Sequence, residues 1–164
     1  MRIGHGWDSH RLVEGRALML GGIEIDTSTL GEDGHSDGDV LLHAIIDALL
    51  GAAALGDIGT HFPPSDSRWK NADSLVLLQI IYEKIRSSRM LVGNIDATVI
   101  LEKPRLADFL PAIRTTIAES LDMNIDSVSV KAKSAEGLDS VGRLQSIEAH
   151  AVVLLTEEPP EMWV

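Results

Sequence analysis

Three residues in the first quarter of the chain have the types and spacing to share a metal ion. Asp8 and His10 are two positions apart, so extended backbone would point both side chains the same way. His43 lies in an otherwise apolar stretch, where an unpaired imidazole would cost about 1–3 kcal/mol. Two histidines, one carboxylate and an open fourth position are the pattern of a catalytic zinc. The alternative is a core His43 bonded to a backbone carbonyl.

Two neighbouring features bear on this site. Asp47 follows His43 by one helical turn, so it could accept the second ring N–H or cap a neighbouring loop. Residues 30–39 carry alternating aspartates like a calcium loop. Counting from Asp33, however, the third residue is His35 and the twelfth is Ala44, so essential oxygen ligands are missing. We predict a loop there, whose His35 and Ser36 could donate hydrogen bonds to an anion or simply be solvated.

Two further segments combine basic and hydroxyl groups just after predicted strands, namely 102–105 and 131–136. They are reasonable places for phosphates, although neither is a Walker loop or a Rossmann fingerprint. On spacing alone, the sequence favours solvated charged turns at these two segments over phosphate sites. The residue types and their spacing therefore indicate at most a metal site and a phosphate-binding site, and no more specific function.

The composition limits the class of protein. With 164 residues and 45% hydrophobic residues, we expect a single domain over 1–164 with its own core. The absence of cysteine excludes disulfides, thiol nucleophiles and iron–sulfur clusters. A net charge of −11 argues against nucleic-acid and membrane partners. The first residues lack the apolar stretch of a signal peptide, so a cytoplasmic protein is expected.

The elements that must position these residues follow from hydrophobic patterning. Asp39 is a plausible N-cap for a helix that is apolar on nearly every side. Paired glycines at 21–22 indicate a hairpin. The predicted strands are 2–7, 17–20, 23–25, 95–101, 128–131 and 147–155, and the predicted helices are 40–54, one capped by Asp73 and one entered at Pro111.

This order predicts an α/β (α+β) sandwich in which a four-stranded mixed sheet and a small hairpin carry helices on one face. The last strand is apolar on both faces at 152–155, which is typical of burial on both sides. Packing between subunits would provide that burial, so we expect a homo-oligomer.

Three segments together resemble one enzyme family. They are RIGHGWDSH at 2–10, HSDGDVLLH at 35–43 and DALLGAAALGDIG at 47–59. The chain is similar over nearly its whole length to the 2-C-methyl-D-erythritol 2,4-cyclodiphosphate synthase family. The resemblance implies a homotrimer with active sites between subunits. It also implies zinc on Asp8, His10 and His43, and a second divalent ion, magnesium or manganese, held with the help of Glu136.

The implied reaction is an intramolecular phosphoryl transfer. It converts 4-diphosphocytidyl-2-C-methyl-D-erythritol 2-phosphate into the cyclic diphosphate and CMP in the non-mevalonate isoprenoid pathway. At family positions, His35 and Ser134 would stabilise the transition state. The remaining substrate-binding positions implied are Ser9, Ser36, Asp57, Ile58, Gly59, Phe62, Pro63, Pro64, Ser65, Asp66, Leu101, Glu102, Lys103, Pro104, Arg105, Leu106, Ala107, Ala132, Lys133 and Ala135.

The chain departs from the family near the expected threefold cavity. Ser140-Val141-Gly142-Arg143 replaces a common Phe-Thr-Gly-Arg stretch, and His150 stands where a carboxylate often pairs with the arginine. Arg143 remains a candidate for binding an anion in that cavity. Two other hypotheses are a metal-dependent phosphoesterase that uses water as nucleophile and a non-catalytic trimer that binds an isoprenoid diphosphate.

Overall fold

A computed structural model describes residues 1–157, and its centre is formed by strand β1 (Arg2–Glu14) and helix α1 (Val40–Ala53). The two elements approach closely because β1 presents glycine to the helix. A Cβ built on Gly4 would lie 1.8 Å from the Ala48 carbonyl oxygen, and one on Gly6 would lie 1.9 Å from the Ala44 oxygen. Gly4, Gly6, Asp8 and His10 alternate on this face, so the packing that needs the glycines also sets the two polar side chains beside the helix.

The main sheet has five strands rather than the four predicted. Their order is β4 (Leu30–Asp33), β1, β7 (Ser146–Glu157), β5 (Met90–Ile100) and β6 (Val128–Lys133). Only the β5–β6 pair is parallel, so the sheet is mixed as expected. The unpredicted strand is β4, inside the segment predicted as a loop. Its composition favours a turn, but pairing with the extended β1 satisfies its backbone groups.

The predicted hairpin is confirmed as β2 (Met19–Leu20) and β3 (Ile23–Glu24). Gly21 and Gly22 join the strands with φ of 60° and 77°, the left-handed conformation that glycine adopts without a steric penalty. The chain also continues β1 seven residues beyond the predicted end at Trp7. Asp8 and His10 therefore do lie on extended backbone and point to one side.

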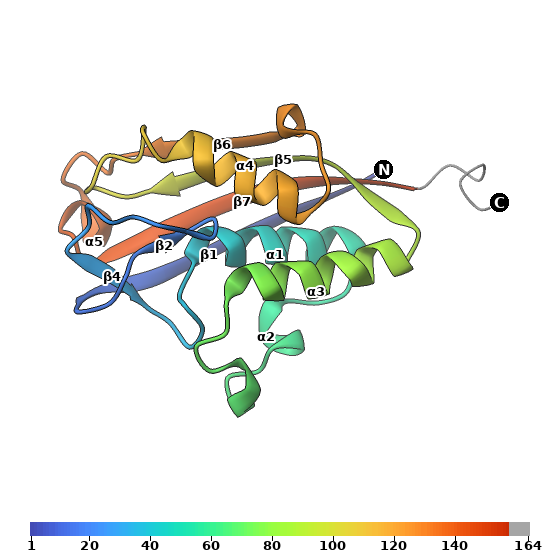
Figure 1. Ribbon diagram of the computed structural model, residues 1–164, viewed down its shortest axis with the longest axis horizontal. Coiled ribbons are helices and arrows are strands. Elements are labelled where there is room, and N and C mark those ends of the chain that lie inside the picture. The colour runs from blue at the N-terminus through green and yellow to red at the C-terminus, as the bar shows by residue number, and fades with distance from the viewer. Residues whose placement is uncertain (158–164) are drawn as a thin grey trace.

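Three helices cover one face of the sheet (Figure 1): α1, α3 (Ser74–Ser87) and α4 (Leu110–Ser120). Asp39 caps α1 by accepting from the Leu42 amide at 3.0 Å, and Asp73 caps α3 through the Leu75 amide at 2.8 Å. Both caps match the predictions. Shorter elements are α2 (Ile58–His61), α5 (Asp139–Gly142) and the 3₁₀ turns at Ser67–Trp69 and Ile125–Ser127. No helix within residues 1–157 is long and apolar enough to cross a membrane.

The two faces of the sheet differ in what covers them. On β7, Ile147, Ala149, Ala151, Val153 and Leu155 point to the helices and are buried. On the opposite face, which we call the open face, Ile3, Trp7 and Val152 are 74%, 50% and 43% exposed. An apolar surface of this kind is typical of an interaction site.

Candidate metal centre and surface pocket

The side chains of Asp8, His10 and His43 lie next to one another, with their potential ligand atoms close together. The Oδ2 atom of Asp8 lies 2.9 Å from Nε2 of His10 and 3.0 Å from Nδ1 of His43. One ligand atom from each residue falls within 4.8 Å of the other two. The strand supplies Asp8 and His10 by its two-residue alternation, and α1 supplies His43 from the helical turn that packs next to them.

The geometry fits a small divalent ion. Zinc binds nitrogen and carboxylate oxygen at about 2.0–2.1 Å, so tetrahedral ligand atoms lie ~3.3 Å apart. The observed separations of 2.9 and 3.0 Å are close to that value. The Asp8 side chain is 29% exposed while the two histidine side chains are nearly buried, so solvent reaches the cluster through Asp8. The donor set, two imidazoles and one carboxylate, is one that zinc prefers.

The far nitrogen of His43 is held by two hydroxyl groups. Nε2 of His43 lies 3.0 Å from Oγ of Ser36 and 3.0 Å from Oγ of Ser74. Ser74 in turn donates to the carboxylate of Asp37 at 2.5 Å. His43 is thus fixed with Nδ1 directed at Asp8, so the sequence-based alternative of a histidine bonded to a backbone carbonyl does not describe it.

Asp47 does not contact the ring of His43. Its Oδ1 accepts from the backbone amide of Ile58 at 2.7 Å, which ties α1 to the start of α2. Of the two roles considered for Asp47, capping a neighbouring loop is the one seen, and orienting His43 is wrong. Burial raises the pKa of Asp47 despite that hydrogen bond.

The far nitrogen of His10 faces a residue that sequence analysis missed. Glu32 on β4 is fully buried, and its Oε2 lies 3.5 Å from Nδ1 of His10. The same oxygen accepts from the Val40 amide at 2.9 Å. Sequence alone gave no signal for Glu32, because its segment has the composition of an exposed loop and only the pairing with β1 buries it.

Charges in the cluster strongly influence one another. Burial works against the ionised form of Asp8, but hydrogen bonds from His10 and His43 outweigh it and hold the pKa of Asp8 well below its usual range. Burial also disfavours a charged His10, yet Asp8 and Glu32 raise the pKa of His10 to about 10. Burial raises the pKa of Glu32 to about 8. Without metal, the cluster therefore retains a proton that a cation must displace.

The loop that carries His35 adjoins the segment 57–71. The amide of Asn71 donates to the His35 carbonyl at 2.9 Å, and the amide of Asp37 donates to the Ala72 carbonyl at 3.0 Å. Within that segment, Asp57 and Asp66 cap the short turns that follow them, and Phe62 is buried with its ring packed edge-on against Trp69. His35 itself is exposed, as are the predicted substrate-binding residues Asp57, Gly59, Pro64 and Ser65, whereas Ile58, Pro63 and Asp66 are half-buried and Ser36 is buried.

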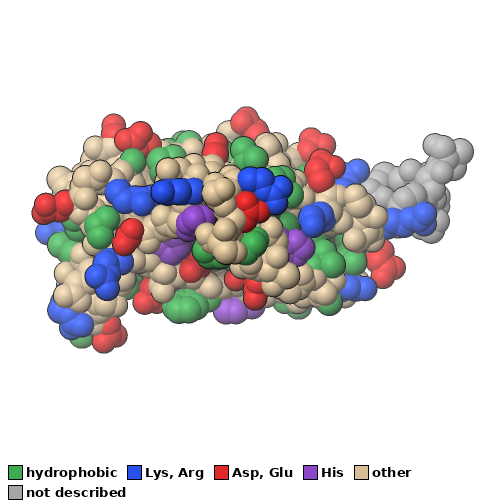
Figure 2. All heavy atoms as spheres, turned by 90° about the horizontal axis from the view of Figure 1, so that it is seen from below, with side chains coloured by type: hydrophobic (Ala, Val, Ile, Leu, Met, Phe, Trp, Pro, Cys, Tyr) green, Lys and Arg blue, Asp and Glu red, His purple; other side chains and the backbone are tan. Residues whose placement is uncertain are grey.

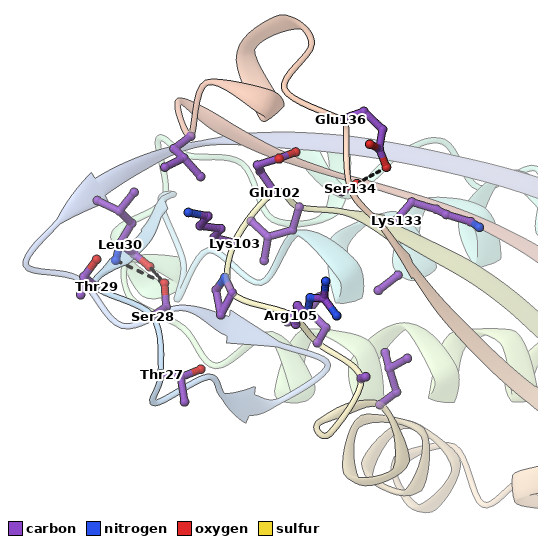
Figure 3. A pocket seen from close by; sticks show the side chains of 17 residues that line it. Thr27, Ser28, Thr29, Leu30, Glu102, Lys103, Arg105, Lys133, Ser134 and Glu136 are labelled. Atoms are coloured by element: carbon purple, nitrogen blue, oxygen red, sulfur yellow. Dashed lines mark hydrogen bonds between the residues drawn. The ribbon is translucent and has the colours of Figure 1, made fainter.

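A second site is a pocket of about 900 Å³ that brings the predicted phosphate segments together (Figure 3). The loop after β5 contributes 101–107, and the end of β6 with the loop after it contributes Ala132, Lys133, Ser134 and Glu136. Ser134 Oγ donates to Oε1 of Glu136 at 3.0 Å, and Glu102 joins the two loops by accepting from the Ala135 amide at 3.1 Å. Sequence analysis missed the third wall, formed by Thr27–Leu30, and the contribution of Leu144.

The metal cluster is not part of this pocket. Ser9 and His10 instead line a different hollow of about 590 Å³, with Ser140, Gln145 and Ser146. Strand β6 is also three positions from β1 in the sheet, roughly 14 Å at the usual strand spacing. Within residues 1–157, the site residues predicted to act together therefore form two groups.

Of the residues that depart from the family pattern, Val141 is buried and Ser140 is half-buried. Arg143 is exposed at the end of α5. His150 is half-buried, with its Nδ1 3.4 Å from Nε2 of His5 and its ring next to Trp7. Elsewhere on the surface, in the view of Figure 2, histidine side chains lie between basic and acidic groups, with no large region of a single charge.

Fold and site together define an α/β protein with a candidate metal site, and comparison with known proteins gives its family. The model of the YgbB family matches residues 1–156, so the chain belongs to that family. A 2-C-methyl-D-erythritol 2,4-cyclodiphosphate synthase of Gloeobacter violaceus is 54% identical over 157 residues, 96% of each chain.

One further sequence relative and one solved structure are also similar to this chain. A bifunctional enzyme IspD/IspF of Albidiferax ferrireducens is 57% identical over 154 residues, and the chain spans 94% of its own length but 37% of that enzyme. A solved synthase structure in a CDP-bound form superposes with a TM-score of 0.87 at 37% identity, covering 94% of this chain and all of that one.

Proposed function

We propose that this protein is a 2-C-methyl-D-erythritol 2,4-cyclodiphosphate synthase, an enzyme of the non-mevalonate isoprenoid pathway. It converts 4-diphosphocytidyl-2-C-methyl-D-erythritol 2-phosphate into the cyclic diphosphate and CMP. The observation that carries the proposal is the Asp8, His10 and His43 cluster in a chain that is more than half identical to a named synthase.

Asp8, His10 and His43 would hold zinc, and Glu136 would help to hold a second divalent ion, magnesium or manganese. When bound, these ions supply Lewis-acid polarisation of phosphoryl oxygens and neutralise charge on the diphosphate. Glu136 suits this role because it is exposed in the pocket and its carboxylate accepts a hydrogen bond from the Ser134 hydroxyl through Oε1, which, among residues 1–157, leaves Oε2 available.

The reaction needs no nucleophile from the protein. An oxygen of the substrate's 2-phosphate forms a bond to the β-phosphorus, and the bond from that phosphorus to the CMP oxygen breaks, so CMP leaves with the electron pair. The protein's task is to fold the substrate back on itself and stabilise the charge that develops. His35 and Ser134 are exposed donors that can serve phosphoryl oxygens.

The pocket beside Glu136 is proposed to hold the cytidine end. Residues 101–107 and 132–134 line it, and Glu102 connects the two segments by accepting from the Ala135 amide. A volume of about 900 Å³ is ample for a nucleotide. The exposed segment 57–66, with Ser9 and Ser36, is proposed to contact the methylerythritol end.

We assign the assembly as a homotrimer with active sites between neighbouring subunits. Two observations support this. The open face presents Ile3, Trp7 and Val152 to solvent in the single chain. The metal cluster and the pocket also lie apart on one chain, so a pocket from one subunit can face the metal cluster of the next. Arg143 would then lie toward the shared cavity, where it could bind an anion.

Product analysis tests the proposal directly. Purified protein is incubated with the diphosphocytidyl substrate and Mg²⁺, with and without prior zinc removal, and products are identified by mass spectrometry. Cyclic diphosphate and CMP, both lost on chelation, are expected. Linear hydrolysis products would instead indicate a phosphoesterase. A protein that unfolds on zinc removal and turns over nothing when loaded would indicate a binding module.

A further inference from the structure

Glu32 is a buried carboxylate with an incomplete set of partners. Its side chain has no exposed surface, although ionisable residues are rarely buried without compensation. One oxygen, Oε2, accepts from the Val40 amide at 2.9 Å. The other, Oε1, is a buried atom with no hydrogen-bond partner among residues 1–157. Buried polar atoms without partners are uncommon, and each calls for an explanation.

The imidazole of His10, next to Glu32, also has a buried polar atom without a hydrogen-bond partner among residues 1–157. This atom is Nδ1, and it lies 3.5 Å from Oε2 of Glu32. That distance is longer than a usual N–H···O hydrogen bond, so such a bond requires the two side chains to approach each other by about 0.5 Å. His10 Nδ1 thus lies next to a carboxylate that can accept more hydrogen bonds than the single one it has from the Val40 amide.

We propose that Glu32 is the positioning residue of the metal centre, accepting a hydrogen bond from Nδ1–H of His10 so that Nε2 carries the lone pair toward the metal. The inference rests on the proposed zinc site. A metal-ligating histidine commonly donates its other ring N–H to a carboxylate or a carbonyl, which fixes its tautomer. His43 has this support from Ser36 and Ser74, and Glu32 gives the equivalent support to His10.

The charges at the site also support a role for Glu32. A divalent ion at this site would meet one carboxylate among its three protein ligands, Asp8. Glu32, behind His10, adds a second negative charge inside the protein, so that ion, ligand and positioning residue sum to neutral. A buried carboxylate that would be costly in isolation is then stabilised by the ion that it helps to bind.

Zinc affinity, measured by competition with a chromogenic chelator, tests the role of Glu32. Glu32→Leu removes the acceptor, and we expect affinity to fall by about 10- to 100-fold. Glu32→Gln keeps a weaker, uncharged acceptor and should fall between Leu and wild type. Asp33→Asn is the matched control, because it removes the same charge from the next residue of β4, whose side chain is 59% exposed. Its zinc affinity should equal that of the wild type.

A spectroscopic readout separates positioning from general stabilisation. In zinc-loaded, ¹⁵N-labelled protein, a slowly exchanging imidazole N–H resonance from His10 is expected far downfield, and it should be lost or shifted in Glu32→Leu. Circular dichroism and unfolding curves check that each variant folds.

Unchanged zinc affinity in both folded Glu32 variants would overturn the role of Glu32 and leave the proposed function intact. If wild-type zinc affinity were equal to that of His43→Ala, the zinc site itself would fail, and the inference with it.

Discussion

The side chains of Asp8, His10 and His43 come from a strand and a helix that pack together, whereas the pocket that holds Ser134 and Glu136 is lined mainly by loops and by the ends of strands. The cluster is half-buried or buried, and its atoms are already spaced for a metal. The pocket side chains Lys103, Arg105 and Lys133 are exposed. Rigid elements thus fix the metal centre, while the pocket depends on loop conformation and, as proposed, on a neighbouring subunit.

The largest expected effect comes from removing a metal ligand. His43→Ala should lose zinc and lower turnover by about 10³-fold, since Lewis-acid stabilisation contributes several kcal/mol. The variant should still assemble, because the open face is unchanged. Zinc content by atomic absorption and turnover by CMP release provide the measurements. Retained zinc with normal turnover would refute the site.

Adding a methyl group where β1 contacts α1 should destabilise the packing that positions Asp8, His10 and His43. In Gly6→Ala the new Cβ would lie 1.9 Å from the Ala44 carbonyl oxygen, so α1 must shift. We expect the free energy of unfolding to fall by about 3 kcal/mol or more. Gly59→Ala is the control on the exposed loop, where the Cβ meets only Asp57 Oδ1 at 3.5 Å. That variant should change stability by less than ~0.5 kcal/mol, and equal losses would contradict the comparison.

In the pocket, we expect the hydroxyl group of Ser134 to contribute to catalysis. Ser134→Ala removes a donor for a phosphoryl oxygen and should lower kcat by about 10²-fold with zinc content unchanged. Ser134→Thr keeps the hydroxyl and should stay near wild type. Steady-state kinetics and metal analysis on both variants check this. Equal activity of the Ala and Thr variants would remove Ser134 from the transition state.

Lowering the pH should reduce the zinc affinity of the site gradually. Because Asp8 and Glu32 raise the pKa of His10 to about 10, the metal-free site holds a proton across the neutral range, and zinc must displace it. Apparent zinc affinity should therefore rise with pH by at least about tenfold per pH unit between pH 6 and pH 9, and more steeply below pH 8, where Glu32 also loses a proton on binding. The raised pKa also stabilises the metal-free fold below pH 6.5, and this contribution is lost as pH rises toward 10. Chelator competition at several pH values measures the slope, and a flat profile would contradict the charge coupling.

Local patterns in the sequence were enough to predict much of the fold. The apolar run and the Asp39 cap placed the central helix within one residue of its observed end, and paired glycines identified the hairpin. The two-residue spacing of Asp8 and His10 also predicted a shared direction correctly. These features are local, since they depend on helical and strand periodicity and on caps that act within one turn.

What depended on distant contacts was not predicted. Asp47 is one turn from His43, yet it accepts from the Ile58 amide instead, because the chain returns after α1 and presents an unpaired amide there. The β4 pairing turned an apparent loop into a strand and buried Glu32 behind His10. The wall formed by Thr27–Leu30 was likewise missed, since nothing in its composition distinguishes it from other turns.

By itself the sequence determined the candidate metal-ligand residue types, the strand alternation that aligns two of them, the apolar helix that carries the third, and the family resemblance. The tertiary structure decided which nitrogen of each histidine is free for a metal, because that depends on what lies behind each ring. Two hydroxyl groups, those of Ser36 and Ser74, lie behind the ring of His43. The buried carboxylate of Glu32, which strand pairing brings there, lies behind the ring of His10. Partners of this kind are separated in sequence and meet only when the sheet forms.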